Sequence, residues 1–119
     1  MTSQYARGTR FEHDVRDDLR ACGYEVVRSA GSKTVVDLIA IKQGQLLFLQ
    51  CKLSPASFVT RTSWNTLFKW AAWVDALPIL AYKHVGKKLP CYERIVGQRD
   101  PRMKGAAVRW TPDEIGRPV

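Results

Sequence analysis

Polar side chains interrupt two apolar segments that otherwise have the composition of buried β-strands. Asp37 lies within the segment VVDLIAI, residues 35–41. Gln50 and Lys52 lie within the segment FLQCK, residues 48–52. A carboxylate or ammonium group that is buried without a partner costs several kcal/mol. These groups must therefore pair with one another, meet solvent in a cleft, or hold a metal ion.

A turn between the two segments brings these polar groups together. Gly44 and the polar residues around it have the composition of a tight hairpin turn. Counting outward from this turn pairs Asp37 with Gln50, and directly opposed residues hold their Cβ atoms about 4.5 to 5.5 Å apart. Lys52 lies two residues beyond Gln50 and therefore shares its face. The simplest outcome is a salt bridge between Asp37 and Lys52, and a metal site is the alternative.

A helix near the N-terminus can add a carboxylate to this cluster. Apolar residues recur from Phe11 to Leu19 at the spacing of one helix face, and Glu12 lies at the edge of that face. Two carboxylates, an amide oxygen and a lysine suit Mg²⁺, which prefers oxygen ligands and usually takes only one or two carboxylates. Mn²⁺ is expected to substitute for it. Lys52 would then lie beside an attacking water or a scissile phosphate.

The elements that must position these residues indicate an α/β domain. Strands are expected over 24–29, 35–41, 46–53, 79–82, 90–96 and 106–110, and helices over 6–22 and 62–77, with another helix starting at Thr111. Gly23 ends the first helix and Pro78 ends the second. This order predicts a mixed central sheet flanked by helices, in a single domain of residues 1–119.

Composition restricts the partners and the environment of the chain. Nineteen Lys and Arg against eleven Asp and Glu give a net charge of +8, which favours a polyanionic partner such as nucleic acid, although a soluble basic protein can carry the same charge. No segment approaches the roughly 20 apolar residues of a membrane helix, and no signal-peptide core is present. We therefore expect an intracellular, cytoplasmic protein without a membrane partner. Three widely spaced cysteines predict reduced thiols.

The pattern resembles the archaeal-type Holliday junction resolvases, a branch of the PD-(D/E)XK nuclease superfamily. The resemblance covers about the first half of the chain, through RGTRFEHDV at residues 7–15, GYEVVRSAGS at 23–32, VVDLIAI at 35–41 and QCK at 50–52. It implies a restriction-endonuclease-like fold with a mixed central sheet flanked by helices. It also implies metal-dependent hydrolysis of phosphodiesters in four-way DNA junctions, with symmetric nicking by a homodimer.

The resemblance assigns roles to the matching residues. Glu12 and Asp37 become metal ligands, and Lys52 supports the attacking water. Our leading hypothesis completes the metal site with Gln50 and the backbone carbonyl of Cys51. The family usually has Glu at the position of Gln50. An amide oxygen brings no charge and cannot act as a base, so we expect weaker metal binding than a carboxylate would give. QxK forms do occur in related nucleases of the VRR-NUC type.

Several further residues are candidates for contact with nucleic acid. Ser32 resembles a family serine that contacts the region of the scissile bond. The candidate contacts to the backbone are Arg7, Arg10, Arg28, Ser32, Lys33, Lys83, Lys87 and Lys88. His84 lies in the same basic turn as the last three lysines, and a solvated turn is the alternative interpretation. His13, beside Glu12, is more typical of a surface residue than of a catalytic acid.

Trp70, Trp73 and Leu77 form an apolar stripe distinct from the helix face that would pack on the sheet. So large an apolar surface needs cover, either from the C-terminal strands or from a partner. Because the resembled family acts as a homodimer and a two-fold dimer matches a four-way junction, we expect a dimer interface here. Two other functions stay open: a nuclease for flaps, forks or other branched DNA, and a module that binds junctions without cutting them.

Overall fold

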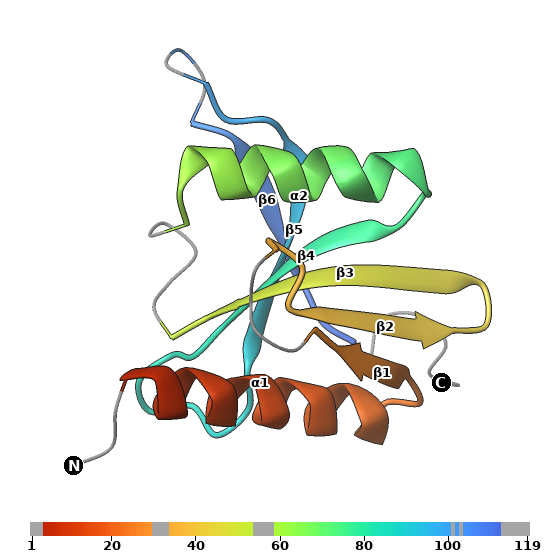
Figure 1. Cartoon of the computed structure of the whole chain (residues 1–119), viewed down its shortest axis with the longest axis vertical. Coiled ribbons are helices and arrows are strands. Elements are labelled where there is room, and N and C mark those ends of the chain that lie inside the picture. Colours follow the sequence, from red (N-terminus) through yellow and green to blue (C-terminus); the bar gives the residue numbers. More distant parts are fainter. Residues whose placement is uncertain (1–3, 30–33, 54–58, 101, 103, 113–119) are drawn as a thin grey trace.

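The computed structural model describes residues 4–29, 34–53, 59–100, 102 and 104–112. Within these residues the helices and strands follow one another as α1 (Gln4–Ala21), β1 (Glu25–Arg28), β2 (Leu38–Lys42), β3 (Gln45–Lys52), α2 (Arg61–Trp73), β4 (Leu77–Tyr82), β5 (Cys91–Gly97) and β6 (Ala106–Trp110) (Figure 1). This order agrees with the predicted order of elements.

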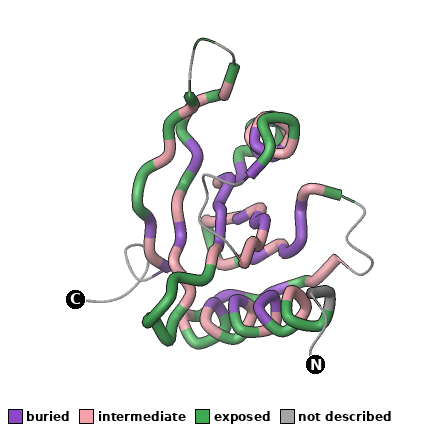
Figure 2. Tube along the Cα trace, turned by 90° about the vertical axis from the view of Figure 1, so that its left-hand side faces the viewer, coloured by how far each residue is buried: buried purple, intermediate pink, exposed green. Residues whose placement is uncertain are grey.

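The strands form one mixed sheet with the order β1-β2-β3-β4-β5-β6. Neighbouring strands are antiparallel except β3 and β4, which run parallel and are connected through α2. α1 covers one face of the sheet and α2 covers the other, and the buried positions gather between the sheet and each helix (Figures 1 and 2). The predicted mixed sheet flanked by helices is therefore confirmed.

α1 is amphipathic, and its apolar side packs on the sheet. Phe11, Val15 and Leu19 are buried in the cluster on this face. The helix ends in a Schellman motif, in which the Tyr24 N–H donates to the Leu19 carbonyl at 3.1 Å. Gly23 has a φ of 95°, which its missing Cβ permits. The prediction that Gly23 ends this helix is confirmed.

The β2–β3 hairpin has the predicted register from its turn as far as the pair Leu38↔Leu49. The ladder stops there, because the Asp37 N–H donates to the Leu49 carbonyl at 2.8 Å. The predicted cross-strand pair between Asp37 and Gln50 was therefore wrong, and the strand expected over 35–41 begins only at Leu38. The carboxylate of Asp37 instead lies where the two strands separate.

α2 ends earlier than predicted, at Trp73. Asp75 takes a left-handed conformation with a φ of 57°, and Leu77 starts β4. Pro78 disfavours a helical conformation for the residue before it, which explains why the helix does not continue through Leu77. Leu77 packs against the apolar cluster on the α1 side. It therefore does not belong to the predicted stripe with Trp70 and Trp73.

The other predicted elements agree with the structure to within two residues at their ends. Pro78 lies inside β4 rather than before it, but the pairing of β4 with β5 begins at Ile79, so its missing N–H costs no bond to β5. The helix start predicted at Thr111 runs into residues 113–119, which lie outside the described residues. No described helix has the length and apolar character needed to cross a membrane.

Candidate metal centre and nucleic-acid interface

Three polar side chains are buried where α1 approaches the ends of β2 and β3. Among the described residues, the buried polar or charged ones are Glu12, Asp37 and Gln50, which are 8%, 8% and 6% exposed. Burial of such groups is costly unless they are paired. Helix packing carries Glu12 to this position, because it neighbours Phe11 on the buried face of α1.

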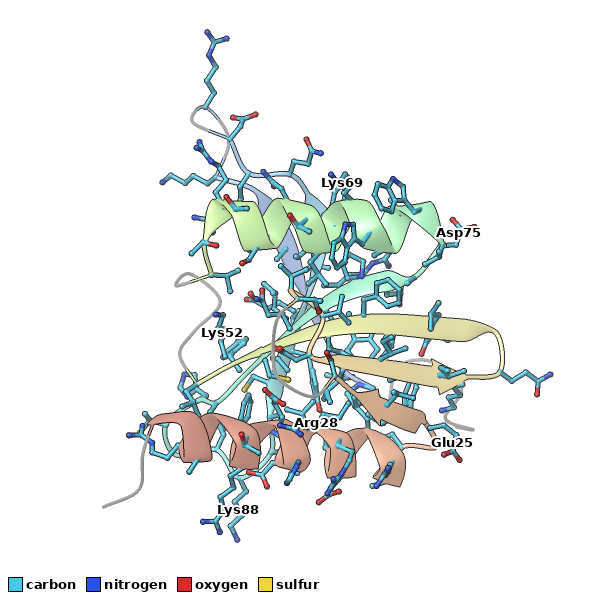
Figure 3. All side chains as sticks on the ribbon, viewed as in Figure 1. Glu25, Arg28, Lys52, Lys69, Asp75 and Lys88 are labelled. Atoms are coloured by element: carbon cyan, nitrogen blue, oxygen red, sulfur yellow. The ribbon has the colours of Figure 1, made fainter. Side chains whose placement is uncertain are left out.

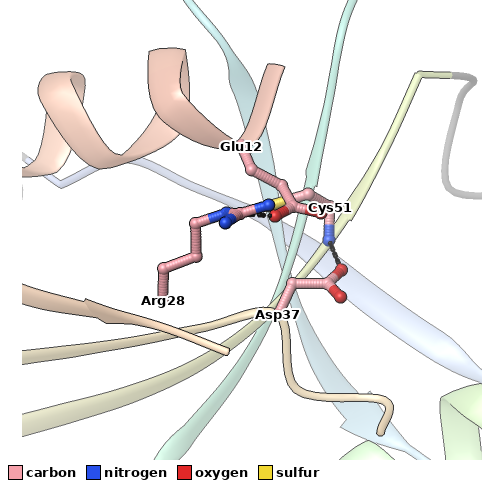
Figure 4. Close-up of polar contacts among 4 residues, drawn as sticks. All are labelled: Glu12, Arg28, Asp37 and Cys51. Carbon is pink, nitrogen blue, oxygen red and sulfur yellow. Dashed lines mark hydrogen bonds and ion pairs between the residues drawn. The ribbon is translucent and has the colours of Figure 1, made fainter. Parts of the chain in front are cut away.

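Three hydrogen bonds fix Asp37. Its carbonyl accepts from the Ser29 N–H at 2.9 Å, and its own N–H donates to the Leu49 carbonyl at 2.8 Å. Its carboxylate oxygen Oδ2 accepts from the Cys51 N–H at 2.8 Å (Figure 4). Because these bonds reach Ser29, directly after β1, and two residues of β3, they hold Asp37 just before the start of β2 with little freedom.

Burial raises the pKa of Asp37 from its ordinary 3.8 to about 6. The hydrogen bond from Cys51 opposes this shift, the charge of Glu12 adds to it, and the charges of Lys52 and Arg28 oppose it. Glu12 and Asp37 are thus close enough to interact electrostatically. In the metal-free protein the ionised carboxylate is disfavoured, and a bound cation would relieve that cost.

Glu12 has a partner that the sequence did not predict. Its Oε1 accepts a hydrogen bond from Arg28 Nε at 2.8 Å, and this ion pair ties α1 to the end of β1 (Figure 4). Arg28 was predicted as a phosphate contact, and here its guanidinium neutralises a buried carboxylate. Among the described residues no ion pair joins Asp37 to Lys52, so the salt bridge considered from the sequence is not formed.

Gln50 Oε1 is buried and has no hydrogen-bond partner among the described residues. Such atoms are rare in folded proteins, and each needs an explanation. Other oxygen atoms at this end of the sheet suit a hard cation: the buried carboxylates of Glu12 and Asp37, and the Cys51 carbonyl, which points to the same side of β3 as the N–H that Asp37 binds. The described residues gather no group of three or more His, Cys, Asp or Glu. Two carboxylates are the number typical of Mg²⁺.

The side chains around this point come from both faces of the sheet. Cys51 packs against the cluster on the α1 side, whereas strand alternation puts Gln50 and Lys52 on the α2 side. Burial raises the pKa of the Cys51 thiol, and the charges of Asp37 and Glu12 raise it further. The thiol therefore stays protonated, and only its backbone carbonyl is a candidate ligand. Lys52 is half-buried at the last position of β3 (Figure 3).

Predicted phosphate contacts from distant parts of the sequence line one groove. Arg7 and Arg10 of α1 and Lys83, which follows β4, line a groove of about 600 Å³. Beside it, Lys87 and Lys88 line a smaller hollow between α1 and the β4–β5 turn, and Figure 3 shows Lys88 next to α1. The groove adjoins the buried cluster, because its lining includes the residue that directly follows Lys52.

Not every candidate residue is located by the structure. Ser32 and Lys33 lie outside the described residues. The apolar part of the groove lining, formed by Phe11, Leu53 and Val85, was not predicted from the sequence. Only Val85 gave a signal in the sequence, as an isolated apolar residue in a basic turn.

Residues 3–100 match the family described as archaeal Holliday junction resolvase (hjc). The chain belongs to this resolvase family. A relative, the crossover junction endodeoxyribonuclease Hjc of Methanocaldococcus jannaschii, is 34% identical over 91 residues, which are 75% of this chain and 68% of that protein. The solved structure of Archaeoglobus fulgidus Hjc, a resolvase from an archaeal hyperthermophile, superposes with a TM-score of 0.63 at 18% identity, covering 87% of this chain and 91% of that one.

These comparisons confirm the resemblance predicted from the sequence and the restriction-endonuclease-like fold class. The match to the resolvase family spans α1 through β5 and ends at residue 100, before β6. The buried cluster and the basic groove both lie within the matched part of the chain.

Proposed function

We propose that the chain is a divalent-metal-dependent endonuclease that resolves four-way DNA junctions. Membership of the resolvase family and the endonuclease name of its relative support the junction-resolving activity. The observation that supports the metal requirement is the unpartnered, buried oxygen of Gln50, together with two buried carboxylates at the same end of the sheet. A buried set of oxygen atoms with this composition is suited to Mg²⁺, and also to Mn²⁺.

Each residue of the cluster has a defined task in this proposal. Glu12, Asp37, Gln50 and the Cys51 carbonyl would hold the cation, and a bound cation would supply stabilisation of charge on the phosphate and a more acidic water. Asp37 must lose its proton for this, and its three hydrogen bonds keep the carboxylate in place. Lys52 orients the attacking water or stabilises the charge that develops on the phosphate.

The basic groove binds the DNA backbone. Exposed cations on α1 and after β4 contact phosphates, which are present in every sequence, so little base specificity is expected. The lining of the groove includes Leu53, the residue after Lys52, so a strand bound there passes close to the end of β3. Shape and charge therefore position the substrate, while the buried cluster performs the hydrolysis.

A homodimer would bring two such sites to one junction, and α2 offers the surface for it. Trp64 lies on the flank of α2 next to β5, where its ring N–H donates to the Gly97 carbonyl at 2.9 Å. Helical periodicity turns Trp70 and Trp73 away from that flank. Trp73 is 70% exposed.

The sheet continues this apolar surface beside α2. Val27 of β1 and Ile41 of β2 are 56% and 47% exposed. Their register places them on the same face as Phe48, which packs into the α2-side cluster. An apolar surface built from α2, β1 and β2 is suited to a second copy of the chain, related by a two-fold axis.

Light scattering tests the dimer. The double substitution of Ile41→Glu with Trp73→Glu should convert a wild-type dimer into a folded monomer, because two charges would be buried in the interface. Val108→Glu is the matched control, since Val108 is 50% exposed on β6. A monomeric wild-type protein at micromolar concentration, or a dimer that survives the double substitution, would contradict this surface.

The function itself is tested with a labelled four-way junction and a linear duplex of the same length, in Mg²⁺ or Mn²⁺. We expect paired, symmetric nicks in the junction and none in the duplex. Lys52→Ala should bind the junction and fail to cut it, while Lys104→Ala, an exposed lysine before β6, should cut normally. Tight junction binding without product in either metal would favour a binding module, and cutting restricted to flaps or forks would favour the other nuclease function.

A further inference from the structure

The turn between β4 and β5 exposes apolar side chains at its tip. Val85 is 94% exposed and Leu89 is 67% exposed. The tip has a defined shape, because the Lys87 N–H donates to the His84 carbonyl at 3.0 Å and Gly86 supports the turn with a φ of 84°. Turns are usually formed by Gly, Pro, Asn, Asp and Ser. Neither the geometry of the turn nor packing in the core therefore requires a valine at this almost fully exposed position.

Val85 is also part of the basic groove. There it lies with two other apolar residues, Phe11 and Leu53, alongside three cations and one carboxylate, Asp14. The excess of positive charge favours an anionic occupant. The apolar side chains favour an occupant that also has an apolar face. A nucleotide has both a phosphate and a flat base.

Cations alone cannot distinguish a junction from a duplex, because both present the same phosphates. An apolar side chain can distinguish them. In a linear duplex the faces of the bases are covered by their stacked neighbours, whereas stacking is interrupted where the arms of a junction meet. Proteins use apolar side chains against unstacked bases in this way, beside cations that hold the backbone.

We propose that the groove takes a nucleotide at the branch point of the DNA, with Arg7, Arg10 and Lys83 on its phosphates and Val85 against the face of an unstacked base. This inference rests on the proposed junction-resolving function and names the side chain that gives preference for the branched substrate. Val85 is then a specificity-determining residue, distinct from the cluster that carries the chemistry.

The test is a pair of affinities, for a four-way junction and for a linear duplex, measured in EDTA with the full chain. Val85→Ser removes the apolar contact and keeps the charges of the turn. We expect it to weaken junction binding about fivefold, as for the loss of one partly buried aliphatic side chain, and duplex binding by less than about twofold. Val85→Leu should retain the preference. Val108→Ser, at an exposed valine outside the groove, should change neither affinity.

A base analogue at the branch point supplies an independent readout. The fluorescence of 2-aminopurine placed there should change when the wild-type protein binds, and this change should be lost with Val85→Ser. Equal effects of Val85→Ser on both substrates, or no effect on either, would overturn the inference while the wild-type preference for junctions still supported the proposed function. A wild-type protein without any preference for junctions would instead overturn the proposed function.

Discussion

The buried cluster and the basic groove are neighbours built from charged side chains, but only the cluster excludes water. Glu12 and Asp37 are each 8% exposed, whereas Arg7 and Arg10 are exposed on the outer side of the same helix. Charges interact strongly where water is excluded and are screened by salt where it is not. Substitutions in the cluster should therefore have large effects that depend on pH, and substitutions in the groove should have small effects that depend on salt.

The largest effect is expected from Asp37→Asn. Asn retains an oxygen that can accept from the Cys51 N–H, so the fold is kept, but a charged metal ligand is lost. We expect cleavage of the junction to slow by about a thousandfold. The control is Asp17→Asn, which changes an exposed aspartate of α1 and should leave the rate unaltered. Single-turnover cleavage at saturating protein measures this, and a loss below about tenfold would contradict a ligand role.

Gln50→Glu should strengthen metal binding, whereas Asp37→Asn weakens it. A third carboxylate would raise the affinity for Mn²⁺ by about tenfold, because hard cations favour charged oxygen ligands. In EDTA the same substitution should lower the free energy of unfolding, because it buries another unpaired charge. Titration of Mn²⁺ by electron paramagnetic resonance and urea unfolding measure the two effects, with Gln43→Glu in the exposed β2–β3 turn as control. Unchanged Mn²⁺ affinity would place Gln50 outside the metal site.

The pH should affect the cluster through Asp37. Its pKa in the folded protein is about 6, above the ordinary 3.8, so the folded state holds this proton more tightly than the unfolded state. The resulting stabilisation of the metal-free protein is present below about pH 4 and is lost as the pH rises through 6. Mn²⁺ affinity should fall about tenfold per pH unit below 6, because metal and proton compete. Asp37→Asn should remove this pH dependence from the free energy of unfolding measured with urea. The same pH dependence in Asp37→Asn and in the wild-type protein would contradict the assignment to Asp37.

The smallest effects are expected in the groove. Arg10→Ala and Lys83→Ala should each weaken binding of junction and duplex alike, by a few-fold, and reduce the slope of log affinity against log salt by about 1. Arg20→Ala, at the other end of α1, is the matched control for an exposed arginine. Fluorescence anisotropy across a salt series measures the slope. A loss of affinity that does not depend on salt would show that these residues do not contact phosphates.

The sequence predicted the parts of the fold that depend on local pattern. Alternation along the strands and the turn at Gly44 were sufficient for the register of the β2–β3 hairpin. They were not sufficient for Asp37. Its N–H donates to the Leu49 carbonyl and its side chain takes the N–H of Cys51, and these two bonds replace the continuation of the ladder. The end of α2 was missed for a similar reason, because a left-handed Asp75 is a local choice that periodicity does not reveal.

The sequence also identified the cations of the groove as candidate phosphate contacts, but it did not predict that they lie together in a groove. Arg7, Arg10 and Lys83 were separate candidates, because no local pattern shows that α1 lies beside the β4–β5 turn. The partner of Glu12 was missed for the same reason, since Arg28 reaches it only through the packing of α1 on the sheet. Residue types thus indicated which side chains could bind a metal ion or phosphate. Tertiary packing decided which of these side chains lie together.

The parallel pairing of β3 with β4 determines where insertions and deletions can be accommodated in this protein. The register places Lys52 opposite Tyr82, and the Lys83 N–H donates to the Lys52 carbonyl at 3.3 Å. The spacing between the lysine of the cluster and the start of the basic turn is therefore set by two adjacent strands. The connection that runs through α2 does not set it. Insertions or deletions in that connection should be tolerated in evolution and in engineering, whereas a shift of one residue in either strand should not.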